Sequence, residues 1–305
     1  MNATSPSGNL FGAACKKGMH VIVIVSKSKK TNVVTVYSYD RVPVIFVFIF
    51  LFCLAVCLIG GKKGIMAILS LAFAFVGIFY LMFPAVYRGA SPILMAVLIS
   101  VLTTIVTLGL LNGLSRKTLA AVIGTASGVI IAGIAAAMFG HFAQISGYNV
   151  SQIETLSFVG QHSSIRIGEL LFAGIIIAAL GAVMDVGMSL ASATEEIHLA
   201  DPSMNRSDLF RAGLRVGKDM MGTMTNTLIL AYVGGSLVTL IINYAYNLSF
   251  NQLANSYIIG IEIMQSFSGS FGVVLTVPIT AFVSAVLCTR KKEEGSKGER
   301  VGTAG

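Results

Sequence analysis

Long apolar runs separated by short polar segments form the pattern of this chain from about residue 42 onward. Several runs reach the roughly 20 residues that an α-helix needs to cross about 30 Å of hydrocarbon. The runs lack the alternation of apolar and polar residues that membrane β-strands show. Because the backbone inside a bilayer must satisfy its own hydrogen bonds, each run is predicted to be a helix. The pattern therefore predicts an all-α polytopic membrane protein.

The same pattern divides the chain into an extracytoplasmic segment at 1–41, a transmembrane helical bundle at 42–288 and a cytoplasmic charged tail at 289–305. About seven membrane-spanning helices are predicted in the bundle. They cover 42–59, 65–83, 93–111, 119–139, 170–183, 225–246 and 271–287. The sequence GGKKG separates the first two spans, and the helical pattern of the fifth span continues past its apolar part.

Two apolar stretches in the N-terminal segment, HVIVIV at 20–25 and VVTVYSY at 33–39, flank a polar KSKKTN sequence. Their β-branched residues and the polar residues between them are typical of a short β-hairpin. The segment lacks the basic start and apolar core of a cleavable signal peptide. We therefore expect a small β-like element outside the membrane.

Composition agrees with a membrane protein. The 305 residues are 55% hydrophobic and only 11% charged, with a mean hydropathy of +0.84, far from the values of soluble globular domains. The net charge of +8 arises from short basic clusters beside apolar runs, which suit lipid headgroups rather than nucleic acid. The lipid bilayer is the expected partner, and assembly with a second copy or another protein stays open.

Lys and Arg are concentrated in alternate connections between the spans and in the tail, which the positive-inside rule assigns to the cytoplasm. These residues are Lys62, Lys63, Arg116, Lys117, Arg206, Arg211, Arg215, Lys218, Arg290, Lys291, Lys292, Lys297 and Arg300. The opposite connections contain only Arg88 and Arg166. We therefore expect a bacterial cell (plasma) membrane protein with its N-terminus outside and its C-terminus in the cytoplasm. Basic residues before the first span violate the rule, and an upstream span missing from this chain would remove the violation.

The fourth predicted span has small residues at every fourth position. They are Gly124, Gly128, Ala132, Ala136 and Gly140. Such a stripe lets neighbouring helices approach closely, because helices in lipid associate through packing. We interpret the stripe as fold packing rather than as a conduction path. Near the last span, SFSGSFG at 266–272 is a candidate break in the helix.

The polar residues that suggest a mechanism lie in the fifth and sixth predicted helices. Ser189, Ser192 and Glu196 follow Asp185 at offsets of four, seven and eleven residues, which place all four on one face of the fifth helix. We expect Asp185 near the inner boundary of the hydrocarbon, where a carboxylate should face protein or water. A matching stripe on the sixth helix comprises Asp219, Thr223, Asn226 and Thr227.

Two interpretations of these stripes stay open. If the two helices pack together, Asp185 and Asp219 would line a polar vestibule whose oxygen atoms suit a hard cation or a proton relay. In the structural alternative, Asp185 pairs with Arg215 or Lys218, and Asp219 caps the sixth helix. Apart from this choice, the stretch with Arg211, Arg215 and Lys218 is predicted to be a short helix at the inner membrane interface.

The sequence gives no support for an enzyme, because it contains no phosphate-binding glycine loop, nucleophile elbow or HExxH motif. No Cys or His spacing indicates a metal site, and we expect no cofactor. Cys53 and Cys57, one helical turn apart, are interpreted as ordinary buried small residues rather than as a thiol pair.

Several motifs resemble the YibE/F-like family of bacterial multi-pass membrane proteins. They are ALGAVMDVGMSLAS at 179–192, GKDMMGTMTNTLILAY at 217–232, YDRVP at 39–43, GGKKG at 60–64 and FGVVLTVPITA at 271–281. The resemblance covers about 37–288 and implies an upstream span with an extracytoplasmic β-rich segment, within which this chain would begin. It implies neither a substrate nor a reaction.

Together these patterns lead to two functional expectations. The first is a permease or ion-coupled transporter of unknown substrate, with a vestibule formed by the two polar stripes. The alternative is a membrane scaffold or receptor subunit without transport activity, which binds a partner through its extracytoplasmic segment.

Overall fold

The computed structural model describes residues 3–4, 18–27, 32–149, 153–161 and 163–302. The chain divides into two compact units, Met1–Ile68 and Leu69–Gly305. Each unit is described by itself.

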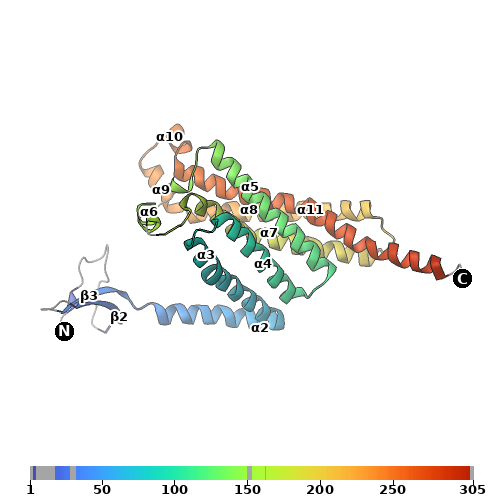
Figure 1. The fold of residues 1–305 in the computed structure, drawn as a ribbon, viewed down its shortest axis with the longest axis horizontal. Coiled ribbons are helices and arrows are strands. Elements are labelled where there is room, and N and C mark those ends of the chain that lie inside the picture. Colours follow the sequence, from blue (N-terminus) through green and yellow to red (C-terminus); the bar gives the residue numbers. More distant parts are fainter. Residues whose placement is uncertain (1–2, 5–17, 28–31, 150–152, 162, 303–305) are drawn as a thin grey trace. The chain divides into compact units, whose positions relative to one another are not determined.

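The first unit contains a small sheet and the beginning of a long helix (Figure 1). Strand β2 (Val21–Lys27) pairs antiparallel with β3 (Asn32–Tyr39), and the two-residue β1 (Ala3–Thr4) runs parallel to β3. The antiparallel pair agrees with the strands predicted from the sequence. Helix α2 (Val42–Val76) follows and changes direction at Gly61, where φ is 53° and ψ is −130°. A residue without a Cβ adopts these angles readily, so the break falls inside the predicted GGKKG stop.

The second unit is a helical bundle (Figure 1). After the end of α2 come η1 (Gly77–Met82), α3 (Phe83–Tyr87), α4 (Pro92–Asn112), α5 (Arg116–Phe142), η2 (Gly147–Asn149), α6 (Ile153–Gln161), α7 (Ile167–Ala200), α8 (Arg206–Gly235), α9 (Leu237–Ala245), α10 (Phe250–Ala254) and α11 (Tyr257–Gly302).

The protein is membrane-embedded, although the expected number of seven spans is not confirmed. In the described residues five helices are long and apolar enough to cross a bilayer, or six if α8 and α9 form one span bent by 58°. One of the five, Val42–Tyr87, has 46 residues, more than twice the roughly 20 that one span needs. It contains the Gly61 break between the first two predicted spans. The third, fourth and fifth predicted spans lie within α4, α5 and α7.

Two local expectations are wrong. Helix α8 is continuous and ends at Gly235. It contains both the stretch predicted as a separate interfacial helix and the start of the sixth predicted span. The candidate break SFSGSFG is helical within α11. Its glycines serve close packing instead: a Cβ on Gly269 would lie 2.7 Å from Leu228 Cδ2, and one on Gly272 would lie 2.8 Å from the Gly128 carbonyl oxygen.

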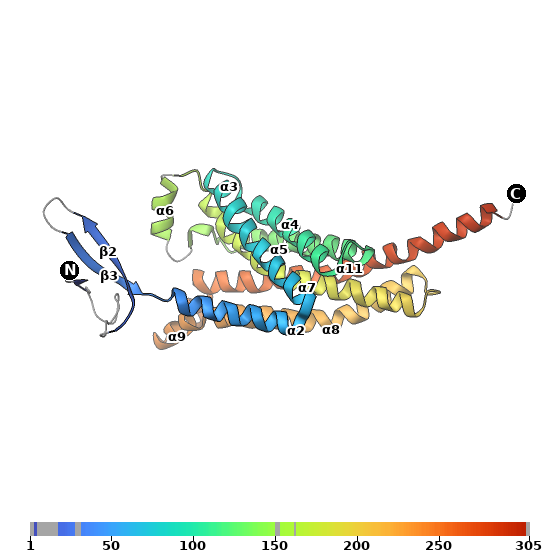
Figure 2. The ribbon, with the colours of Figure 1, turned by 90° about the horizontal axis from the view of Figure 1, so that it is seen from below.

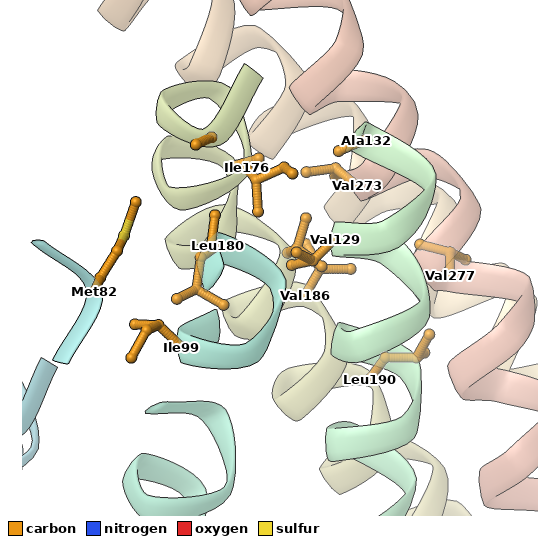
Figure 3. Packing of buried hydrophobic residues seen from close by; sticks show 14 of the residues in the cluster. Met82, Ile99, Val129, Ala132, Ile176, Leu180, Val186, Leu190, Val273 and Val277 are labelled. Carbon is orange, nitrogen blue, oxygen red and sulfur yellow. The ribbon is translucent and has the colours of Figure 1, made fainter. Parts of the chain in front are cut away.

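The core of the bundle lies where α5, α7 and α11 meet. Figure 3 shows part of it, with Val129 of α5, Val186 and Leu190 of α7, and Val273 and Val277 of α11 in one apolar cluster. All five are almost completely buried.

The predicted small-residue stripe of α5 is confirmed as packing. If Gly124 and Gly128 had Cβ atoms, these would lie 1.9 and 1.8 Å from the hydroxyl oxygens of Thr280 and Thr276, respectively. In lipid such contacts take the place of the hydrophobic effect between helices.

Contacts between helix ends define the two ends of the bundle. At the basic end, Arg116 Nη1 donates to the Leu287 carbonyl oxygen at 2.9 Å, and Lys117 Nζ lies 2.9 Å from Glu195 Oε2. At the opposite end, the Ser91 hydroxyl donates to Glu169 Oε2. One end each of α5, α7 and α11 meets at the basic end. The distribution of Lys and Arg in the sequence assigned these same helix ends to one side of the membrane.

Candidate functional site: the polar face of α7 and α8

Helix α7 has one buried face and one open face. Its buried face includes Val183, Val186 and Leu190, each 0% exposed. Asp185 and Ser189 are exposed, and Ser192 is half-buried. A Cβ placed on Gly181, one turn before Asp185, would meet no atom within 4 Å. The predicted polar stripe of α7 therefore faces away from the bundle core.

Helix α8 repeats this arrangement. Leu209, Ala212, Gly213, Gly217 and Leu228 are its buried residues. The residues singled out from the sequence are all exposed: Arg211, Arg215, Lys218, Asp219, Thr223, Asn226 and Thr227. The side chains of the stripe are thus exposed and do not pack in the core of the bundle. We call the six exposed residues Asp185, Ser189, Asp219, Thr223, Asn226 and Thr227 the polar face.

The packing of α7 against α8 places the two stripes at similar depth. The helices run side by side and are joined by 201–205 (Figure 2). A Cβ on Gly217 would lie 3.4 Å from Leu190 Cδ2, and one on Gly213 would lie 3.0 Å from Thr194 Oγ1. This antiparallel register brings Asp185 level with residue 222, about 4.5 Å along the axis from Asp219. The two carboxylates therefore lie at similar depth along the bundle.

Depth in the membrane follows from the two ends of α7. Glu169 and Glu195 mark these ends through their contacts with Ser91 and Lys117. They are about 39 Å apart along the helix, so a hydrocarbon layer of about 30 Å centred between them ends about 4.5 Å inside each. Asp185, about 15 Å from Glu195, then lies about 10 Å inside the hydrocarbon.

The same register locates α8. Asp219 is level with residue 188 of α7, and Asn226 is level with residue 181, close to the middle of the hydrocarbon. The hydroxyls of Thr223 and Thr227 donate to the carbonyl oxygens of Met220 and Thr223, both at 2.9 Å. Their lone pairs remain able to accept hydrogen bonds or to bind a cation.

Asp219 does not cap its helix, and no ion pair of Asp185 with Arg215 or Lys218 is seen among the described residues. The cap of α8 is Asn205, which accepts from the Asp208 N–H, so Asp219 lies in the interior of the helix and caps nothing. Among the ion pairs of the described chain, none joins Asp185 or Asp219 to a cation. Arg211 instead lies 3.9 Å from Asp208 on its own helix.

Sequence reasoning missed the glycines that shape the polar face. Gly213 and Gly217 set the approach of α8 to α7 and to α11, since a Cβ on Gly217 would lie 2.4 Å from Val277 Cγ1. Gly222 lies between Asp219 and Asn226 on the open side, where a Cβ would meet no atom within 4 Å. The glycines themselves were a signal in the sequence. Glycine inside a helix destabilises that helix relative to alanine, so its presence usually has a packing reason.

The described hollows lie away from the polar face. One, of about 380 Å³, is lined by residues of α5 and α11 such as Met138 and Phe271. Another, of about 510 Å³, is formed by α9 and the residues that follow it, including Asn243 and Tyr244. Neither contains a residue of the polar face.

Comparison with known proteins assigns a family. The family model described as YibE/F-like protein matches residues 48–290, which include both polar stripes. No curated protein and no solved structure matches the chain.

Proposed function

The chain belongs to the YibE/F-like family, and we propose that it is a permease or ion-coupled transporter whose pathway follows the polar face. The observation that carries the proposal is the position of Asp185 and Asp219. Both are exposed on the surface of the bundle, and the helix register supports a depth inside the hydrocarbon for both. A carboxylate in contact with lipid costs a few kcal/mol, so a polar environment has to exist there in the membrane.

The chemistry of the polar face favours a cation or proton as the transported or coupling ion. Two carboxylates, the hydroxyls of Ser189 and Thr223 and the amide of Asn226 supply oxygen ligands of the kind that hard cations bind. Intramembrane carboxylates also serve as proton relays. The proposed activity moves a solute and requires no bond of it to be broken.

We further propose the plasma membrane of a bacterium as the location, with the basic end in the cytoplasm. The positive-inside rule supports this orientation. It makes the polar face open toward the cytoplasmic half of the membrane and puts the N-terminal sheet outside.

Flux through purified protein in liposomes tests the proposal. Proton, Na⁺, K⁺, Mg²⁺ and Ca²⁺ gradients are applied first, and small anions afterwards. For any flux that the wild type supports, Asp185→Asn and Asp219→Asn should each lower the rate at least about tenfold, since one lost charge contact at about 1.4 kcal/mol has that effect.

The matched control is Glu154→Gln, the same change of carboxylate to amide at an exposed position of α6. It should leave the flux unchanged. Wild-type rates in both aspartate variants for every supported flux would refute the transport role of the polar face.

A second function has one specific observation in its favour. Four consecutive apolar residues of β2 are exposed to solvent: Ile22, Val23, Ile24 and Val25. Exposed apolar residues that adjoin one another often mark a protein contact. A scaffold or receptor subunit that binds a partner through this strand would lose a co-purifying protein on Ile22→Ser/Ile24→Ser, whereas the aspartate variants would retain it.

A further inference from the structure

Four residues on the exposed side of α8 are spaced as in a seam, the line along which two helices pack in a coiled coil. Arg215, Asp219, Gly222 and Asn226 have offsets of four, seven and eleven residues, the repeat by which two parallel helices pack along one line. Gly222 has open space where a Cβ would be, so another backbone can approach closely at this point. A buried Asn in such a seam fixes the register of the two helices.

Neither lipid nor the first helix of the chain suits this seam. Lipid chains offer no hydrogen bond to Asp219 or Asn226. The sequence VPVIFVFIFLFCLAVCLIG at 42–60 contains no charged or amide side chain, and its two cysteines are weak donors. The occupant has to bring polar and cationic groups at the depth of the polar face.

We propose that a second copy of this chain covers the seam. A two-fold axis along the membrane normal places the two α8 helices parallel, so equal residues meet at equal depth. Asn226 of each copy then faces its counterpart, and two amides can exchange hydrogen bonds. The same symmetry brings the two Asp219 carboxylates together, and Arg215 of each copy, one helical turn away, supplies the opposite charge that can reach both of them.

This arrangement completes the proposed pathway and rests on the proposed function. One copy supplies only one wall, formed by α7 and α8. The second copy supplies the other wall and removes the carboxylates from lipid, so the transport site lies between two chains.

Cysteine cross-linking in membranes tests the dimer without reference to flux. In a chain whose Cys15, Cys53, Cys57 and Cys288 are replaced by Ser, Asn226→Cys should form a disulfide-linked dimer on oxidation with copper phenanthroline. The control is Ile130→Cys on α5. The contact of Gly187 with Thr125 and the pair Glu195–Lys117 place Ile130 at the depth of Asn226, and its side chain is 44% exposed. It should give no dimer.

Two results would overturn the proposal. One is the absence of a linked dimer for both Asn226→Cys and Thr223→Cys while each chain purifies normally. The other is a link within one chain between Asn226→Cys and Cys53 or Cys57, when these are retained, since it would assign the seam to the first helix. A linked dimer whose aspartate variants keep wild-type flux would leave the interface standing and refute only the transport function.

Discussion

Gly128→Leu should strongly destabilise the bundle. A Cβ at residue 128 would lie 1.8 Å from Thr276 Oγ1, 2.7 Å from Val183 Cγ1 and 3.0 Å from the Gly272 carbonyl oxygen. The Thr276 hydroxyl is held by a 2.7 Å hydrogen bond to that same carbonyl, so it cannot turn away without losing its partner. Overpacking typically costs about 1–3 kcal/mol and sometimes more. We expect a loss at or above the upper value, against a total stability of about 5–15 kcal/mol.

The measurement is the yield of monodisperse protein in detergent and the midpoint of its thermal unfolding. Gly109→Leu on α4 is the matched control, because a Cβ there would meet no atom within 4 Å, and it should purify like the wild type. Equal yields and midpoints for both variants would show that α5 and α11 are not packed as described.

The sequence predicts the packing stripe of the core better than it predicts the polar face. The stripe of α5 could be predicted because small residues at every fourth position have one physical use in a membrane helix, close packing. Its partners could not, since nothing in the local pattern shows that Gly124 and Gly128 meet Thr280 and Thr276 rather than another helix. The strand pair at the N-terminus was also predictable, from β-branched residues around a polar turn.

The stretch from Arg206 to Tyr246 shows why other expectations were wrong. Charge favoured a separate interfacial helix before the sixth span, but no proline or other strong breaker separates Arg206 from Gly235, and the helix simply continues. Periodicity correctly grouped Asp219, Thr223 and Asn226 on one face. It gave no information on whether that face points into the bundle or out of it, because this depends on Gly213 and Gly217 packing against α7 and α11.

Gly217→Leu should lower flux at least about tenfold although every carboxylate of the polar face is retained. A Cβ at residue 217 would lie 2.4 Å from Val277 Cγ1 and 3.4 Å from Leu190 Cδ2. A leucine there would push α8 away from both helices that hold it and would displace Asp219 from the level of Asp185. We expect a loss of stability of about 3 kcal/mol and a flux reduced as far as in Asp219→Asn. Thermal unfolding and liposome flux on the same preparation measure both effects.

Gly222→Leu is the informative contrast, because residues 217 and 222 lie on opposite sides of the same helix. Within one chain the leucine has open space, and replacing glycine in a helix removes a penalty of about 1 kcal/mol, so the fold of each copy should be retained. If a second copy packs along the seam, the same leucine separates the two α8 helices, and the yield of the Asn226→Cys dimer should fall. A Gly222→Leu variant with an undiminished dimer yield would contradict the seam, and a Gly217→Leu variant with wild-type flux would contradict the dependence of the pathway on the packing of α8.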